Sequence, residues 1–121
     1  FTWLNQDEIL IGTNAGLVLF NSALGSLNHF AKASFNNKKV RAIFRDSKDQ
    51  IWVGTYDEGI YVIDLNGRIK KHYEVAEDQL VGHQVWRIIE DRNNNIWIAT
   101  FNGLSRYNPE NDEFTNFISA G

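Results

Sequence analysis

The sequence predicts an all-β protein built from consecutive four-stranded antiparallel blades of a β-propeller. Three observations favour this fold: a motif recurs about every 44 residues, each copy divides into four strand-like segments, and no helical periodicity is present. Four strands in a unit of 40 to 45 residues are typical of a propeller blade. The 121 residues hold about 2.7 units, which we divide into a partial blade at 1–34 and blades at 35–78 and 79–121.

The repeat rests on several anchors that recur at similar spacing. The Gly-Thr pair that begins at Gly12 returns at Gly54 and, as Ala-Thr, at Ala99, with spacings of 42 and 45 residues. The segments 40–46 (VRAIFRD) and 85–91 (VWRIIED) are 45 residues apart. Two further anchors, each spaced by 43 and 44 residues, are a turn glycine (Gly16, Gly59, Gly103) and a late aromatic residue (Phe30, Tyr73, Phe117).

Each unit is expected to run from an inner strand to an outer strand. The segments 40–46 and 85–91 alternate weakly and lead into polar turns, SKDQ and RNNN, whose Asp and Asn residues favour turns. The short apolar runs 51–55 and 96–100 predict strands buried on both faces. Third and fourth strands follow at 17–20, 60–65 and 104–108, and at 27–30, 69–73 and 114–117. The connector 74–82 could hold a helical turn, and the opening FTWL is a cut or degenerate first strand.

The number of units is too small for a closed ring, because propellers have roughly four to eight blades. We therefore expect either a piece of a longer propeller, which the absence of an initial Met favours, or several copies that assemble. A β-sandwich of some ten strands is the alternative fold, but a sandwich rarely repeats its sequence.

Composition excludes several functions. Cys is absent, so disulfides, thiol catalysis and Cys-based zinc sites are excluded. The net charge of -3 without a basic block lacks the electrostatic footprint of a nucleic-acid binder. No apolar run approaches the roughly 18 residues of a membrane span, so we expect no direct membrane contact by this segment.

Most conspicuous residues have a structural interpretation. Trp52 and Trp97 occupy equivalent places in the central strands, which predicts core packing rather than sugar stacking. Asp46 and Asp91 end the inner strands just before a turn, so we expect them to accept backbone N–H bonds there. We expect no metal site, since the histidines lack the spacing of metal ligands and are expected at strand ends or in the connector (His29, His72, His83). We also expect no cofactor and no catalytic residue.

The motif V-x-x-I-x-x-D-x-x-x-x-I-W-I-G-T-x-x-G-L-x-x-Y resembles the two-component regulator propeller repeat. Residues 85–107 match it nearly throughout, residues 40–63 match with one insertion, and residues 9–20 match its second half. Departures are Ala99 for Gly, Ile63 for Tyr and Leu10 for Trp. The resemblance implies part of the periplasmic sensor region of a hybrid two-component histidine kinase, which senses oligosaccharides and regulates genes for glycan use. The kinase would lie outside this chain.

Candidate binding residues come from two loops that a propeller blade would bring to one rim. One loop enters the inner strand and the other follows the central strand. Aromatic rings beside planar polar groups suit a sugar, and an arginine suits a carboxylate or sulfate through bidentate pairing. The candidates are Arg41, Tyr56, Asp57, Glu58, His83, Gln84, Trp86, Arg87, Phe101 and Asn102.

The sequence therefore predicts a non-enzymatic, ligand-sensing propeller segment whose partners are an oligosaccharide and neighbouring blades or further copies of itself. Two alternatives remain open. A protein-interaction scaffold would bind a protein and not respond to sugars. A glycan-active propeller enzyme would need catalytic carboxylates in non-equivalent loops.

Overall fold

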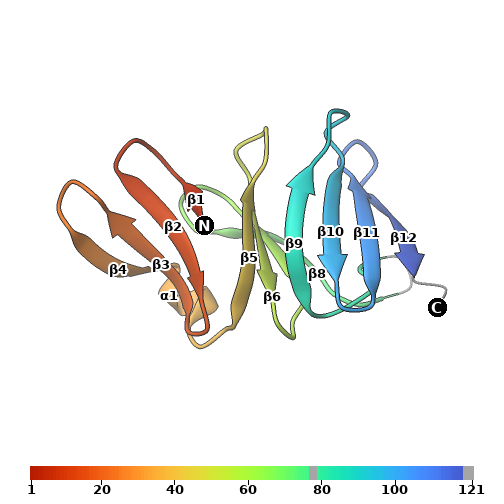
Figure 1. Cartoon of the computed structure of the whole chain (residues 1–121), viewed down its shortest axis with the longest axis horizontal. Coiled ribbons are helices and arrows are strands. Elements are labelled where there is room, and N and C mark those ends of the chain that lie inside the picture. The colour runs from red at the N-terminus through yellow and green to blue at the C-terminus, as the bar shows by residue number, and fades with distance from the viewer. Residues whose placement is uncertain (77–78, 119–121) are drawn as a thin grey trace.

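The chain forms three four-stranded antiparallel sheets that follow one another along the sequence (Figure 1). The structure is a computed structural model, and it describes residues 1–76 and 79–118. The first sheet has strands β1 (Thr2–Trp3), β2 (Glu8–Thr13), β3 (Gly16–Asn21) and β4 (Ser26–Phe30). The second has β5 (Val40–Arg45), β6 (Ile51–Thr55), β7 (Ile60–Ile63) and β8 (Ile69–Tyr73). The third has β9 (Val85–Glu90), β10 (Ile96–Thr100), β11 (Gly103–Asn108) and β12 (Glu113–Ile118).

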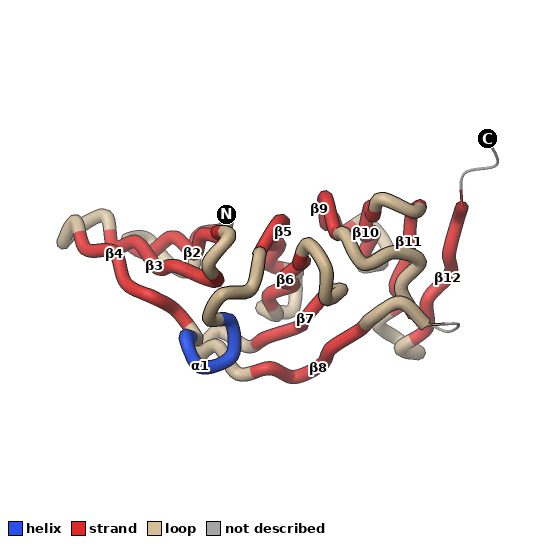
Figure 2. The backbone as a smooth tube through the Cα atoms, turned by 90° about the horizontal axis from the view of Figure 1, so that it is seen from below, coloured by secondary structure: helices blue, strands red, loops and turns tan. Residues whose placement is uncertain are grey.

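Within each sheet the strands are neighbours in their sequence order, as in a propeller blade, so the predicted all-β fold class is confirmed. Figure 2 shows the three sheets fanning out, with β5 and β9 close to one another. The opening segment does form a first strand, because Thr2 pairs with Leu10 and Trp3 pairs with Ile9. At two residues this strand is much shorter than β5 and β9.

The hairpins that leave β5 and β9 are closed by repeat-equivalent aspartates. Asp46 accepts two backbone N–H bonds of its own turn and a third hydrogen bond, 2.9 Å long, from Trp52 Nε1. Asp91 repeats this arrangement and accepts a 2.7 Å bond from Trp97 Nε1. That indole bond holds the pKa of Asp91 below its ordinary value. The predicted turn role is confirmed, and each aspartate also fixes the indole of its central strand.

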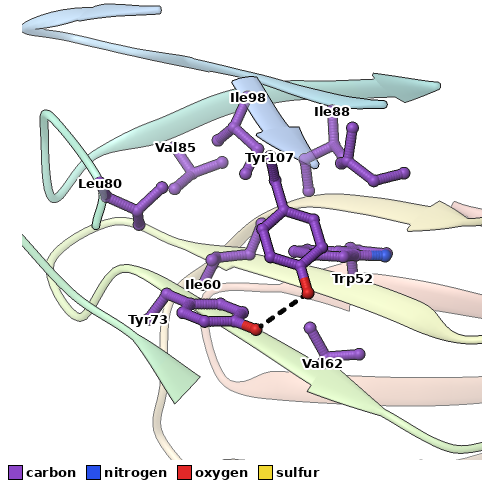
Figure 3. Close-up of a cluster of buried hydrophobic side chains, with 10 residues drawn as sticks. Trp52, Ile60, Val62, Tyr73, Leu80, Val85, Ile88, Ile98 and Tyr107 are labelled. Atoms are coloured by element: carbon purple, nitrogen blue, oxygen red, sulfur yellow. Dashed lines mark hydrogen bonds between the residues drawn. The ribbon is translucent and has the colours of Figure 1, made fainter. Parts of the chain in front are cut away.

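Two hydrophobic clusters join the sheets. The first interface, between the first and second sheets, is mainly aliphatic and includes Leu10, Leu17, Val53 and Ile63. The second interface, between the second and third sheets, is rich in aromatic rings. Figure 3 shows Tyr73 and Tyr107 pointing toward one another beside Trp52.

The central strands differ in how completely they are buried. Every residue of β6 is buried, and Trp52 is only 2% exposed, as the sequence predicts. In β10 burial alternates, and Trp97 is only half-buried. Core packing is therefore complete for Trp52 and partial for Trp97, because within the described residues no sheet covers the far side of the third sheet.

The short helix α1 (Lys32–Phe35) was not predicted, because four residues leave no periodicity in the sequence. It contains the expected boundary between residues 34 and 35, and it buries Phe35 edge-on against Tyr61 with ring centroids 5.2 Å apart. The connector 74–82 contains an isolated parallel bridge between Val75 and Leu80, and the expected helical turn falls in part on residues 77–78, which lie outside the described residues. Residues 77–78 and 119–121, which include the expected boundary at 78, lie outside the described residues.

Candidate ligand site at the inner strands

Equivalent β-bulges interrupt the inner strands of the second and third sheets. Along β5, Val40 pairs with Thr55 and Ala42 pairs with Gly54, so Arg41 has no partner on β6. Along β9 the ladder skips Trp86 in the same way, between residues 85 and 87. A bulge leaves the extra residue unpaired and re-aims its side chain. The side chains of Arg41 and Trp86 therefore do not follow the alternation of side chains between the two faces of the sheet that their strands otherwise show.

The two bulged side chains meet at one small hollow. Trp86 is 58% exposed and Arg41 is also exposed. The guanidinium carbon of Arg41 lies 4.9 Å from the ring centroid of Tyr56, which is a favourable cation–π geometry. The hollow is lined by Arg41, Tyr56, Gln84, Val85 and Trp86. Four candidates from three separate segments of the sequence are thus brought together.

The loops that carry these residues lie on the same rim, as expected from the sequence. The backbone N–H of Tyr56 donates to the carbonyl of Lys39 over 2.9 Å. The backbone N–H of Phe101 donates to the carbonyl of Gln84 over 3.0 Å. These equivalent bonds tie the loop after each central strand to the loop before its own inner strand.

A larger groove of about 480 Å³ runs beside this hollow between the inner strands. Residues of β5 and β9 form most of its wall, with Gly12 of β2 and the exposed ring of Phe1. Arg41 and Trp86 border both the groove and the hollow. A ligand that covered the two bulges could therefore extend along the groove.

The structure separates the remaining candidates from the hollow. Asp57, His83, Phe101 and Asn102 are exposed on the rim but line neither the hollow nor the groove. Glu58 is engaged by Lys38, whose Nζ lies 3.0 Å from Oε1. That hydrogen bond raises the pKa of Lys38 above its ordinary value.

Arg87 borders the groove, but it also lines a second hollow with residues of β10 and β11. It pairs with Ala99 in the regular ladder, in the place that Ala42 takes opposite Gly54 in the second sheet. Arg87 therefore contributes both to the groove and to the far face of the third sheet.

Lys39 belongs to the site and was missed among the candidates. Its Nζ lies 5.3 Å from the ring centroid of Tyr56, so Lys39 and Arg41 both contact this ring. In the part of the chain that the structure describes, neither cation forms an ion pair with a carboxylate. The sequence feature that could have identified Lys39 is its position two residues before Arg41 in the same loop. The arrangement gives an exposed indole beside two cations, which suits a ring-shaped polar ligand with negative charge.

Three consecutive four-stranded sheets, packed face to face with an inner strand in each, define this chain as a segment of a β-propeller. The family model described as "two component regulator propeller" matches residues 34–57 and 79–102. The second and third units therefore each contain a match to the repeat of that family, and the resemblance seen in the sequence is confirmed.

Solved structures extend the similarity to the whole chain. Two structures of one extracellular domain from B. thetaiotaomicron, assigned once to a one-component and once to a hybrid two-component system, are 24% identical, with TM-scores of 0.80 and 0.81. They cover 98% and 97% of this chain and 18% of their own. An extracellular domain assigned to another hybrid two-component system of B. thetaiotaomicron is 28% identical, with a TM-score of 0.75 over 91% of this chain and 15% of its own.

This chain thus spans less than a fifth of the length of these solved structures. No curated protein matches the sequence. Among the residues that the structure describes, no helix has the length and apolar character needed to cross a membrane.

Proposed function

We propose that this chain is a ligand-sensing propeller segment in the extracytoplasmic, periplasmic part of a membrane-bound two-component receptor. We propose further that the groove of about 480 Å³, at the place where Arg41 and Trp86 border it, binds an oligosaccharide. The observation that carries this proposal is the pair of equivalent bulges, which directs an indole and a guanidinium to one place. The family repeat and the extracellular domains that share this fold support the sensing role.

The chemistry at this part of the groove suits a sugar. The exposed face of Trp86 can stack on the C–H face of a pyranose, while Gln84 and Arg41 offer hydrogen bonds to its hydroxyl groups. Arg41 and Lys39 favour a sugar that carries a carboxylate or a sulfate, because charge-assisted hydrogen bonds are stronger than neutral ones. The residues of this segment bind and orient the ligand, and they carry out no bond-breaking step.

Signalling would follow from a shift between receptor arrangements. A ligand can shift such an equilibrium only by its difference in affinity for the two states. The groove is lined by residues of both the second and the third sheet, so a ligand there would favour one relative placement of the two blades. The receptor's histidine kinase, outside this chain, would then change the transcription of genes for glycan use.

The binding test uses the whole protein that carries this segment and oligosaccharides from enzymatic digests of polysaccharides, followed by isothermal titration calorimetry. Trp86→Ala should weaken binding at least about tenfold, which corresponds to about 1.4 kcal/mol. Leu24→Ala is the matched control, because Leu24 is 79% exposed and lies in the turn between β3 and β4, outside the hollow. Equal affinity of Trp86→Ala and the unaltered protein would contradict the assignment of the site.

A second measurement tests the receptor assignment. An antibody against this chain should detect a membrane-bound protein several times larger than 121 residues in fractionated source cells. A soluble band of about the size of this chain would contradict the receptor. Binding of a protein with no response to sugars would favour the scaffold, and loss of hydrolysis on changing one carboxylate would favour the enzyme.

A further inference from the structure

The loop that follows the central strand of the second sheet is one residue longer than its counterparts. Residues 56–58 lie between the end of β6 and the turn glycine, whereas the third sheet has only residues 101–102 at this place and the first sheet only residues 14–15. The longer loop carries Tyr56, so its geometry bears directly on the proposed site.

Glu58 fixes this loop to three neighbouring segments. Its carboxylate accepts hydrogen bonds from Lys38 Nζ, over 3.0 and 3.2 Å, and from the Tyr61 hydroxyl of β7, over 3.4 Å. Its backbone carbonyl accepts a 2.7 Å bond from Nε2 of His72 in β8. The His72 ring stacks on Tyr61, with centroids 3.9 Å apart. We name Lys38, Glu58, Tyr61 and His72 the clamp.

The third sheet shows the same loop without a clamp. The amides of Tyr56 and Phe101 form equivalent bonds to the loops before their inner strands. Tyr56 is nevertheless half-buried and contacts Lys39 and Arg41, whereas Phe101 is 71% exposed and lines neither the hollow nor the groove. The loop 101–102 has neither a third residue nor a carboxylate, so it cannot form this clamp.

The clamp adjoins the proposed site in both loops. Lys38 pairs with Glu58, and the next residue, Lys39, accepts the Tyr56 amide bond over 2.9 Å. The Tyr56 ring in turn lies 4.9 Å from the guanidinium carbon of Arg41. A guanidinium that is stacked on a fixed ring has less conformational freedom to lose when it binds a ligand. The position of Tyr56 therefore affects how well Arg41 is oriented for binding.

We propose that Glu58 and Lys38 are positioning residues of the oligosaccharide site, which hold Tyr56 against Arg41 before a ligand arrives. Neither residue lines the groove or the hollow, so we expect neither to contact the ligand. The effect on affinity rests on the proposed function, whereas the placement of Tyr56 does not and can be measured without a ligand. The longer loop thus distinguishes the two bulges, because Arg41 is held by a ring while Trp86 stays 58% exposed.

Hydrogen exchange in the ligand-free, full-length protein tests the placement of Tyr56. Glu58→Ala should accelerate exchange of the Tyr56 amide at least about fivefold, because its bond to Lys39 then opens more often. The Phe101 amide forms the equivalent bond in the third sheet and should exchange at an unchanged rate in the same variant. Unchanged exchange at Tyr56 would overturn the proposal. Equal acceleration at both amides would also overturn it, since a general loss of stability would then be the cause.

Exchanging the two charges tests whether the ion pair holds the loop. Lys38→Glu alone should accelerate exchange at Tyr56. Lys38→Glu combined with Glu58→Lys restores an opposite pair and should return the rate to within about twofold of the unaltered protein. A double variant that exchanges as fast as the single variants would overturn the assignment to this ion pair.

Asp57→Ala is the matched control, because it removes a carboxylate from the same loop. Asp57 is exposed and forms no ion pair within residues 1–76 and 79–118, so exchange at Tyr56 should not change. Acceleration as large as in Glu58→Ala would overturn the role of the clamp, since loss of any negative charge in the loop would then suffice.

Calorimetry connects the clamp to binding, with oligosaccharides from enzymatic digests of uronic-acid polysaccharides as the probe. Glu58→Ala should weaken their binding about 3–10-fold, because Arg41 is then less well oriented. The sign separates the two explanations, since loss of a carboxylate near two cations would by charge alone strengthen the binding of an acidic sugar. The double variant should bind like the unaltered protein.

The outcomes also separate this inference from the proposed function. If Trp86→Ala weakens binding and Glu58→Ala does not, the positioning role is overturned and the proposed function stands. If Trp86→Ala leaves binding unchanged, the proposed function fails, and the rate of exchange at Tyr56 alone decides whether the clamp holds this ring.

Discussion

The first and second interfaces occupy the same positions in the repeat but use opposite chemistry. At the end of β5, Arg45 donates to the carbonyls of Trp3 and Leu4 in the first sheet, over 3.2 and 2.9 Å. At the end of β9, 45 residues later, Glu90 accepts from the backbone N–H and the hydroxyl of Ser47 in the second sheet, over 2.8 and 2.7 Å. A cation in one blade and an anion in the next thus form the same link to the preceding blade.

The outer parts of the two interfaces also differ in chemistry, since one contact is apolar and the other is polar. In the first interface Gly67 lies so close to Phe30 that a Cβ atom would be 3.1 Å from its ring, and the contact is apolar. In the second interface Asp112 accepts hydrogen bonds from Tyr73 and Tyr107, over 2.6 and 2.7 Å, and from Lys71 over 3.1 Å. The repeat therefore determines where neighbouring blades touch, while the side chains that make the contact are free to differ.

The largest expected effect is on the indole at the centre of the second interface. Trp52→Ala should lower the free energy of unfolding by about 3–5 kcal/mol, because it removes a buried ring and its bond to Asp46. Urea denaturation measures the change. Trp86→Ala is the matched control and should cost under about 1 kcal/mol, since Trp86 is exposed. Similar costs for both variants would show that the second interface does not depend on its aromatic core.

The next effect tests the feature that the two interfaces share. Gly54→Ala and Gly12→Ala should each cost about 1–3 kcal/mol, because the added methyl group meets a valine of the next sheet. Chemical denaturation of both variants gives the values. Ala99→Gly removes the methyl group at the third equivalent position and should cost only about 0.5–1 kcal/mol. A neutral Gly54→Ala would indicate that consecutive blades can slide apart at little cost.

The acidic group of the second interface should make this interface sensitive to pH. The hydroxyls of Tyr73 and Tyr107 and the Lys71 ammonium lower the pKa of Asp112 to about 2. Its ordinary value is about 3.9, so its stabilising effect is complete above about pH 4 and is lost as the pH falls toward 2. Asp112→Asn should cost about 1 kcal/mol at pH 7, since water screens this half-exposed carboxylate.

The control for Asp112 is the pH profile itself. Thermal unfolding of the unaltered protein and of Asp112→Asn should differ at pH 7 and converge between about pH 4 and pH 2. A constant difference across this range would show that Asp112 does not titrate in the folded state at the expected pH.

The smallest effects concern the links at the ends of β5 and β9. Glu90→Ala and Arg45→Ala should each cost about 0.5 kcal/mol, because these hydrogen bonds are exposed to water. Hydrogen exchange is the more sensitive measurement. Glu90→Ala should accelerate exchange of the Ser47 amide, whereas Arg45→Ala should not affect it. Unchanged exchange at Ser47 in Glu90→Ala would contradict the role of this link.

Much of the fold could be predicted because the repeat is written into the sequence. Turn aspartates and central apolar runs have local signatures, and the structure reproduces them at Asp46 and in β6. Trp97 is less buried than the repeat-equivalent Trp52, because burial depends on the blade that follows, which Trp52 has and Trp97 lacks within the described residues. The helix α1 was missed because its single turn is stabilised by packing of Phe35 rather than by its own sequence.

The candidate site was predictable only in its loops. Residues around 36–41, 56–58, 82–87 and 101–102 were placed on one rim, and the backbone bonds of Tyr56 and Phe101 agree. Which of them converge depends on the bulges at Arg41 and Trp86, and the extra residue of a bulge is not marked by any residue type. Sequence alone therefore could not separate Trp86 from Arg87, although they are adjacent.

The bulges have a consequence for how such a chain can acquire new specificity. The residues on either side of each bulge are paired to the central strand, so they must satisfy the geometry of two neighbouring blades. The bulged residue has no partner on the central strand, so it is free of this constraint. One blade accordingly has Arg41 at this position and the next blade has Trp86. A repeated blade thus offers one position per copy at which substitutions leave folding intact, and duplication of blades multiplies the chemical groups available to recognise a ligand.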